Sequence, residues 1–111
     1  MVSPSVGSIV LAPFPFSNLS QSTLRPAVVV ADAGRGDWIL CQITSNPYGD
    51  PRALALSDGD FLSGSLRVTS FARPGKLCTA NHSLLVSEFV VPRAQAYARV
   101  IAAIVQMLQP A

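Results

Sequence analysis

The apolar residues of this chain come in short runs separated by clusters of Pro, Gly, Asn and Asp, and this punctuation restricts the fold to short strands. Ile9–Phe14, Ala27–Ala31 and Trp38–Ser45 are such runs, and each has the length of a β-strand rather than of a helix. Between and after them lie Asp32–Asp37, which predicts a hairpin loop, and Asn46–Pro51, a dense turn cluster. The chain therefore predicts a mainly β fold.

The rest of the chain adds further strands and one helix. Additional strands are predicted over residues 53–56, 65–72 and 76–79 and within 83–91, with a turn at Pro74-Gly75 and a loop at 57–61 that has room for one helical turn. Pro13 and Pro15 cannot donate to a ladder, so the first strand ends there or lies at a sheet edge.

A helix is predicted to begin at Pro92, where the missing N–H costs nothing. Its apolar residues at helical spacing are Ala94, Tyr97, Ile101, Ile104, Val105 and Leu108. Five to seven short strands with a single C-terminal helix favour a small, strongly bent, mostly antiparallel sheet or barrel.

Length and composition exclude some classes of protein. A chain of 111 residues predicts one domain over residues 1–111, and 50% hydrophobic against 13% charged residues excludes a disordered chain. So few charges also predict an apolar surface covered by a partner, most simply a second copy. Cys41 and Cys78 lie in apolar runs and are predicted to be buried free thiols of a cytoplasmic protein. No signal peptide is predicted, because the N-terminus has no basic residue and Pro13 and Pro15 break its apolar run, and no membrane span is predicted, because Val100–Leu108 is too short.

Metal and cofactor chemistry finds no support in the sequence. His82 is the single histidine, and no second histidine or cysteine pair stands at ligand spacing. The six acidic residues are scattered through turns, and Gly34-Arg35-Gly36 is neither a phosphate loop nor a dinucleotide fingerprint. We therefore expect no metal and no cofactor.

What remains is a set of cationic, polar and aromatic residues. Arg25 is the first charged residue of the chain and opens a strand, while Gln42 and Thr44 alternate with apolar Cys41 and Ile43 and so share a face. The other members are Ser45, Asn46, Arg67, Phe71, Arg73 and Lys76. Cations interleaved with an aromatic ring suit single-stranded nucleic acid.

Each of these residues also has an ordinary structural explanation. An arginine before a proline is often a solvated edge residue, a strand threonine is common, and Phe71 fits a core. The charge distribution favours a polyanion partner, because residues 61–111 hold five of the eight basic residues and one of the six acidic ones. It lacks the dense basic clusters of a strong non-specific DNA binder.

Taken together, several segments resemble the MazF/PemK (Kid-like) family of toxin ribonucleases. The matching segments are Gly7 with Ile9–Leu11 and Pro13–Phe16, Leu24–Val30, Ile39–Ser45, Asp60-Phe61 with Gly64–Leu66, and Ser70–Leu77, followed by the C-terminal helix. The resemblance covers nearly the whole chain. Its specific parts are the Arg25-Pro26 start of one strand and the Ile43-Thr44 end of another.

The resemblance implies an SH3-like barrel, a homodimer and metal-independent cleavage of single-stranded RNA at a short sequence. It implies attack of the 2′-hydroxyl on the adjacent phosphate, a cognate antitoxin with a flexible acidic tail, and Arg25 with Thr44 as the catalytic pair. The RNA-binding residues would be Phe16, Ser17, Asn18, Gln42, Ser45, Asn46, Arg67, Phe71, Arg73 and Lys76. Two alternatives stay open: a CcdB-like toxin of the same fold that inhibits DNA gyrase, and a non-catalytic SH3-like RNA-binding module.

Overall fold

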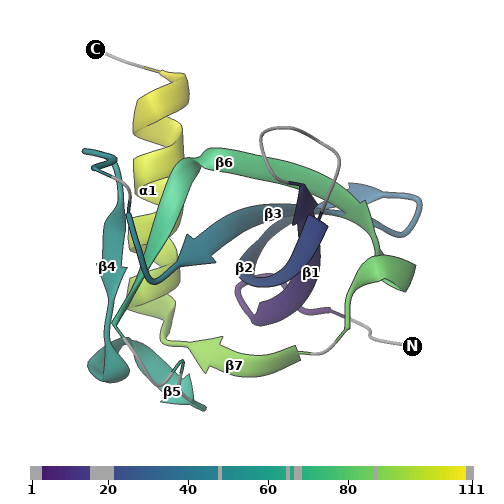
Figure 1. Cartoon of the computed structure of the whole chain (residues 1–111), viewed down its shortest axis with the longest axis horizontal. Helices are drawn as coiled ribbons and strands as arrows, with labels where there is room; N and C mark the ends of the chain where they lie inside the picture. The colour runs from purple at the N-terminus through teal and green to yellow at the C-terminus, as the bar shows by residue number, and fades with distance from the viewer. Residues whose placement is uncertain are drawn as a thin grey trace.

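The chain folds into a curled antiparallel sheet with one long helix packed against it (Figure 1). A computed structural model describes residues 4–15, 22–47, 49–64, 66, 69–86 and 88–109. Within these residues seven strands form the sheet in the order β4-β6-β3-β2-β1-β7-β5, and every neighbouring pair is antiparallel. The predicted mainly β class, a small bent barrel-like sheet with a C-terminal helix, is confirmed.

The elements have the following bounds. They are β1 Ile9–Pro15, β2 Ser22–Gly34, β3 Asp37–Thr44, β4 Leu54–Leu56, η1 Asp58–Asp60, β5 Phe61–Ser63, β6 Ser70–Asn81, η2 His82–Leu84, β7 Glu88–Pro92 and α1 Ala94–Leu108. The short strand β5 was not predicted, and the single strand expected within 83–91 is a 3₁₀ turn followed by β7.

The two prolines of β1 lie at an edge, as predicted. β1 pairs with β2 along its whole length, but it pairs with β7 only through Ile9 and Val10. On the β7 side the carbonyl of Leu11 accepts a hydrogen bond from the Val86 N–H at 2.9 Å. The backbone groups of alternate residues point to the same side of a strand, so those of Pro13 and Pro15 point to the same side as those of Leu11. Among the described residues no strand pairs with that side of β1 at the two prolines, so the missing N–H of each proline costs no hydrogen bond between strands.

The turn predicted at Pro74-Gly75 is wrong, because β6 runs unbroken through both residues. Against β3, the partner on β6 changes from Leu77, opposite Cys41, to Ala72, opposite Ile43. The intervening residues of β6 form an irregularity that bends the strand without ending it. A proline fits there because no ladder bond is required of its nitrogen.

The helix begins later than predicted. Pro92 is the last residue of β7, Arg93 is the N-cap, and α1 begins at Ala94. The residues of α1 that are buried against the sheet are Ala96, Val100 and Ile104, a stripe at four-residue spacing. Tyr97 also holds the helix to the sheet, since its hydroxyl donates to the Val30 carbonyl at 2.8 Å.

Three residues expected on the apolar stripe, Ala94, Val105 and Leu108, are exposed instead. Val105 is 48% exposed and Leu108 is 66% exposed, so the apolar surface of α1 extends beyond the face that the sheet covers. In the described part of the chain, no helix is both long and apolar enough to cross a membrane.

The sheet buries apolar side chains on both of its faces. One cluster fills the space between the sheet and α1, and it contains Val28, Cys41 and Ile43 together with Val100 and Ile104. A second cluster lies within the curl on the other face. Its buried members are Val10, Ala12, Ala27, Val29, Leu40, Ala80 and Leu85.

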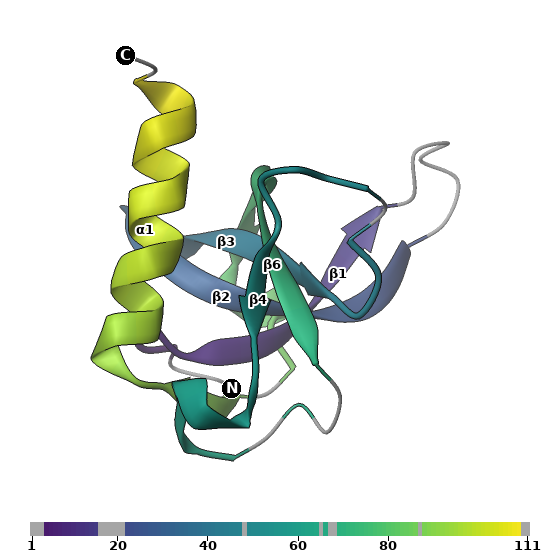
Figure 2. The same ribbon diagram turned by 90° about the vertical axis from the view of Figure 1, so that its left-hand side faces the viewer.

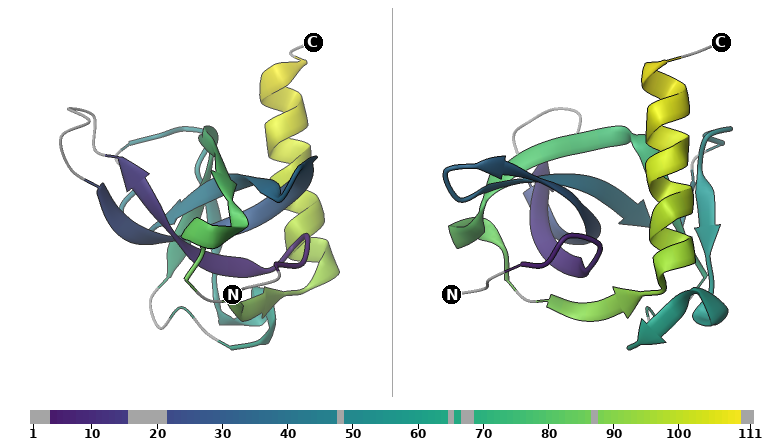
Figure 3. Two further views of the ribbon diagram at one scale, coloured as in Figure 1. Left: turned by 90° about the vertical axis from the view of Figure 1, so that its right-hand side faces the viewer. Right: turned by 180° about the vertical axis from the view of Figure 1, so that it is seen from behind.

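The β2–β3 hairpin turns at Arg35-Gly36, inside the predicted loop. Arg35 has φ 57° and Gly36 has φ 80°, and two successive positive φ values are typical of the type I′ turn that suits a twisted hairpin. The turn contacts η2, because the Gly36 carbonyl accepts from the His82 N–H at 2.8 Å. Figure 3 shows the hairpin and η2 side by side.

We expect Gly36→Ala to destabilise the protein more than Gly34→Ala does. Both glycines have positive φ, which costs about 1–2 kcal/mol for a residue with a Cβ. A Cβ on Gly36 would also lie 2.7 Å from the His82 Nδ1, whereas a Cβ on Gly34 meets no atom within 4 Å. Urea unfolding of the two variants measures the difference, and equal losses would contradict the expected clash.

Candidate functional site

The β2–β3 ladder brings the two predicted catalytic residues to the place where two pairs of strands diverge. The ladder ends at the pair Ala27–Gln42, after which β2 stays with β1 and β3 stays with β6. Arg25 lies two residues before Ala27, and Thr44 lies two residues after Gln42. Since directly opposed residues share a face and alternate residues return to it, Arg25, Gln42 and Thr44 belong to one face.

This face is the one that carries the second apolar cluster. Along β2, Arg25 is followed on this face by buried Ala27 and Val29, and along β3, Gln42 and Thr44 follow buried Leu40. The polar residues of the candidate site therefore continue the rows of apolar residues on this face. The apolar cluster that packs against α1 lies on the opposite face of the sheet. In Figure 2 the β1–β2 end of the sheet points away from α1.

Burial differs between the two predicted catalytic residues. Arg25 and Gln42 are half-buried, whereas Thr44 is only 8% exposed. The Thr44 hydroxyl binds the backbone of Asn46, accepting from its N–H at 3.2 Å and lying 3.1 Å from its carbonyl oxygen as donor. The side chain therefore shapes the end of β3 as well as facing the candidate site.

β6 contributes an aromatic ring to the same face. Phe71 is the register partner of Thr44 and is half-buried. Ser45, Asn46 and Lys76 are exposed, so their positions leave them accessible to a ligand. The remaining predicted RNA-binding residues, Phe16, Ser17, Asn18 and Arg67, lie outside the described residues.

Arg73 is engaged by an acidic residue that the sequence had not singled out. Its Nε donates to the Asp50 carboxylate at 3.1 Å, and the two side chains are 18% and 15% exposed. The second carboxylate oxygen of Asp50 accepts from the Arg52 N–H at 2.9 Å. The Arg52 N–H and then the Arg73 guanidinium hold the pKa of Asp50 below its usual value.

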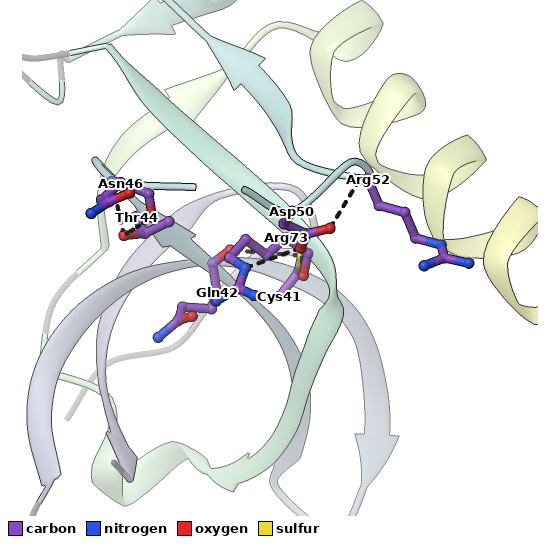
Figure 4. A network of polar contacts seen from close by, with 7 residues as sticks. All are labelled: Cys41, Gln42, Thr44, Asn46, Asp50, Arg52 and Arg73. Carbon is purple, nitrogen blue, oxygen red and sulfur yellow. Dashed lines mark hydrogen bonds and ion pairs between the residues drawn. The ribbon is translucent and has the colours of Figure 1, made fainter. Parts of the chain in front are cut away.

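Figure 4 shows this network together with Thr44 and Asn46. Cys41 adds a link to β3, because its Sγ lies 3.3 Å from the Arg73 carbonyl oxygen as a donor. Burial raises the pKa of the Cys41 thiol to about 12, so the sulfur keeps its proton at neutral pH. Asp50 and Arg73 are far apart in sequence, and no local pattern could have predicted that they pair.

Other features of the described residues do not form a second site. No cluster of three or more metal-binding side chains occurs among them. A cavity of about 690 Å³ lies between Pro51–Leu54 and the α1 residues Ala103, Gln106 and Met107, and no predicted site residue lines it. His82 contacts the Gly36 carbonyl through Nδ1 at 3.3 Å, as a structural loop residue does.

We expect both thiols of the folded protein to react slowly with iodoacetamide at pH 8. Cys41 is buried and Cys78 is half-buried, and burial raises the pKa of both. Only the thiolate attacks, and at pH 8 it is the minor form of each group. Intact mass after alkylation, with urea-unfolded protein as the reactive control, measures the rate. Rapid native labelling of Cys41 would contradict its burial.

Comparison with known proteins places the fold. No protein-family model matches the chain, and no curated protein matches it by sequence. Among solved structures, it is similar to MazF from Deinococcus radiodurans, with 22% identity, a TM-score of 0.71, and coverage of 97% of this chain and 98% of that one. A MazE–MazF complex from the same organism gives 21% identity and a TM-score of 0.71, with 97% of each chain covered.

A third solved structure extends the likeness to another group of bacteria. It is an endoribonuclease in complex with its cognate antitoxin from a mycobacterial species, with 14% identity and a TM-score of 0.70. The match covers 97% of this chain and 95% of that one. The sheet order, the helix and the near-complete coverage thus lead to one conclusion: this chain has the fold of the MazF proteins.

Proposed function

We propose that this chain is a metal-independent, sequence-specific endoribonuclease toxin that cleaves single-stranded RNA. The observation that carries the proposal is the shared face of Arg25 and Thr44, each two residues beyond the last β2–β3 pair. The fold shared with MazF structures supports the same conclusion. Gln42 and Phe71 on this face, with Ser45, Asn46 and Lys76 accessible beside it, supply groups for phosphate, base and sugar.

The reaction uses a nucleophile that the substrate provides. The RNA 2′-oxygen forms a bond to the adjacent phosphorus and gives up its proton, while the bond from phosphorus to the 5′-oxygen breaks and that oxygen gains a proton. The products are a 2′,3′-cyclic phosphate and a 5′-hydroxyl. The protein must align the attacking oxygen and stabilise the charge that gathers on the phosphorane oxygens.

Arg25 and Thr44 would divide this stabilisation. A guanidinium can donate two parallel hydrogen bonds to phosphate oxygens, and Arg25 is half-buried, where such bonds are strengthened. Because a guanidinium is a poor proton acceptor, we assign Arg25 to charge stabilisation rather than to proton abstraction.

The Thr44 hydroxyl would supply a third donor. It has one hydrogen, and that hydrogen lies in reach of the Asn46 carbonyl at 3.1 Å. Donation to a phosphate oxygen would exchange that bond, while the bond accepted from the Asn46 N–H is kept. Binding RNA would therefore rotate the hydroxyl without moving the backbone of β3.

We expect Arg25→Ala to lower the cleavage rate on the order of a hundredfold or more, because one charged donor to the phosphorane is lost. Arg25→Lys should recover only part of the rate, since the planar fork is gone. Thr44→Ser should stay active, whereas Thr44→Val should not. The assay is purified protein with a single-stranded RNA pool in EDTA, with products mapped by primer extension.

The matched control is Arg93→Ala, which removes one positive charge from an exposed N-cap of α1. It should cleave at the wild-type rate. The absence of discrete products from the wild type, or full activity of Arg25→Ala, would contradict the proposal. Intact RNA together with toxicity that survives Arg25→Ala would instead favour the gyrase-inhibiting alternative, and RNA binding without turnover would favour a binding module.

We also propose two protein partners. One is a cognate antitoxin whose acidic tail competes with RNA for the face of Arg25, in keeping with the antitoxin complexes among the structural neighbours. The other is a second copy of the chain. α1 leaves Val105 and Leu108 48% and 66% exposed, and paired apolar side chains of this kind mark an interface on a chain with few charges.

We expect the protein to be a dimer by light scattering at micromolar concentration. The double substitution Val105→Asp and Leu108→Asp should shift it to a monomer, because it would bury two charges in the interface. Leu62→Asp is the matched control, since Leu62 is 66% exposed on β5 rather than on α1. A monomeric wild type would contradict the proposed homodimer.

A further inference from the structure

Asp50 organises the connection between β3 and β4 with every polar group it has. Its N–H donates to the Pro47 carbonyl at 2.9 Å, and its carbonyl accepts from the Ala53 N–H at 3.1 Å. One carboxylate oxygen accepts from the Arg52 N–H at 2.9 Å, and the other accepts from the Arg73 Nε at 3.1 Å. One residue thus closes successive turns and joins them to the sheet.

Arg73, the partner of Asp50 in this ion pair, is itself held in the sheet. Arg73 lies in the irregular part of β6, where its carbonyl oxygen accepts from the Cys41 thiol at 3.3 Å. Cys41 is buried in the cluster beneath α1. With side chains only 18% and 15% exposed, the Arg73–Asp50 pair is shielded from most of the solvent, so the attraction between its charges is screened less than that of a surface pair.

The same connection starts at the candidate catalytic hydroxyl. Thr44 ends β3 and binds Asn46 through Oγ1, and a few residues later the chain reaches Asp50. The connection is therefore fixed at one end by Thr44 and near the other end by Asp50 (Figure 4). A shift of the Asp50 end would be passed to Asn46 and to the hydroxyl that binds it.

We propose that Asp50, through its ion pair with Arg73, is a positioning residue that holds the β3–β4 connection against β6 and thereby fixes the Thr44–Asn46 edge of the RNA site. This inference rests on the proposed RNA cleavage for its consequence in catalysis, but the anchoring itself can be measured without RNA. In this proposal the Arg73 guanidinium binds Asp50. Its effect on RNA cleavage is indirect, because it holds the β3–β4 connection in place.

The experiment compares Asp50→Asn with Asp60→Asn. Asp60 is a matched control because one of its carboxylate oxygens accepts from the Ser57 N–H while the other pairs with Arg99. That pair joins η1 to α1 rather than to the candidate site. The two substitutions remove equivalent interactions in different places, so a general loss of stability would appear in both.

The first readout is amide hydrogen exchange by NMR. Asp50→Asn should speed exchange of the amides at positions 50, 52 and 53 by about tenfold, since their hydrogen bonds depend on the held turn. Asp60→Asn should leave those amides unchanged. If Asp50→Asn leaves them equally protected, the proposed anchoring is overturned, whatever the protein does to RNA.

The second readout is cleavage of a short RNA that contains the mapped site. Asp50→Asn should lower kcat about tenfold to a hundredfold, as expected when a catalytic group is displaced by about 1 Å, with the larger share of the loss in kcat rather than in KM. Arg73→Ala should do the same, and the double variant should be no worse than either single one.

The outcomes separate the two proposals. A wild type that cleaves no RNA defeats the proposed function and leaves the exchange result to decide the anchoring. A wild type that cleaves RNA, with Asp50→Asn and Asp60→Asn equal in kcat, overturns the positioning role. Additive losses in the double variant would also overturn it, because Asp50 and Arg73 would then act independently.

Discussion

The register between β2 and β3 is the constraint on which the candidate site depends. At the turn, Gly34 pairs with Asp37, and an undisturbed ladder from there would set Arg25 opposite Asn46. Two register shifts, one between Asp32 and Gly34 and one between Val29 and Ala31, move the pairing so that Ala27 meets Gln42. Arg25 and Thr44 then stand at equal distances in sequence from the last pair. Irregularities far from the site therefore select which polar residues border it.

A site of this kind obtains its strength from placement rather than from the number of its charges. With 13% charged residues, the chain has few cationic side chains that could bind a polyanion. The structure sets Arg25 at the end of a buried row of Val29 and Ala27, where solvent screens a charge less than it does at an open surface. Under the proposed function, groups held by strands would also require little reorganisation on binding a phosphate, which is the condition for electrostatic stabilisation of a transition state.

Much of this arrangement could be predicted from local patterns. The alternation of Cys41 and Ile43 with Gln42 and Thr44 correctly placed the two pairs on opposite faces of β3, and the glycines around Arg35 marked the hairpin turn. These predictions are correct because each feature is determined by residues that are close together in the sequence.

The features that were wrongly predicted or missed depend instead on contacts between residues that are far apart in the sequence. Pro74 and Gly75 look like a turn, yet pairing with β3 carries β6 through them. Pro92 fits the first position of a helix, yet it is the last residue of β7, where it pairs with Phe61 of β5. The Asp50–Arg73 pair likewise spans two elements that only the folded sheet brings together.

The outer strands of the sheet have a consequence for how this protein behaves at high concentration. β4 and β5 are three residues each, and the free edge of β1 beyond Leu11 carries Pro13 and Pro15. These three edges therefore offer little unpaired backbone as a template for another chain. Short edge strands and edge prolines are features that disfavour edge-to-edge association, which matters for a polypeptide with half of its residues hydrophobic.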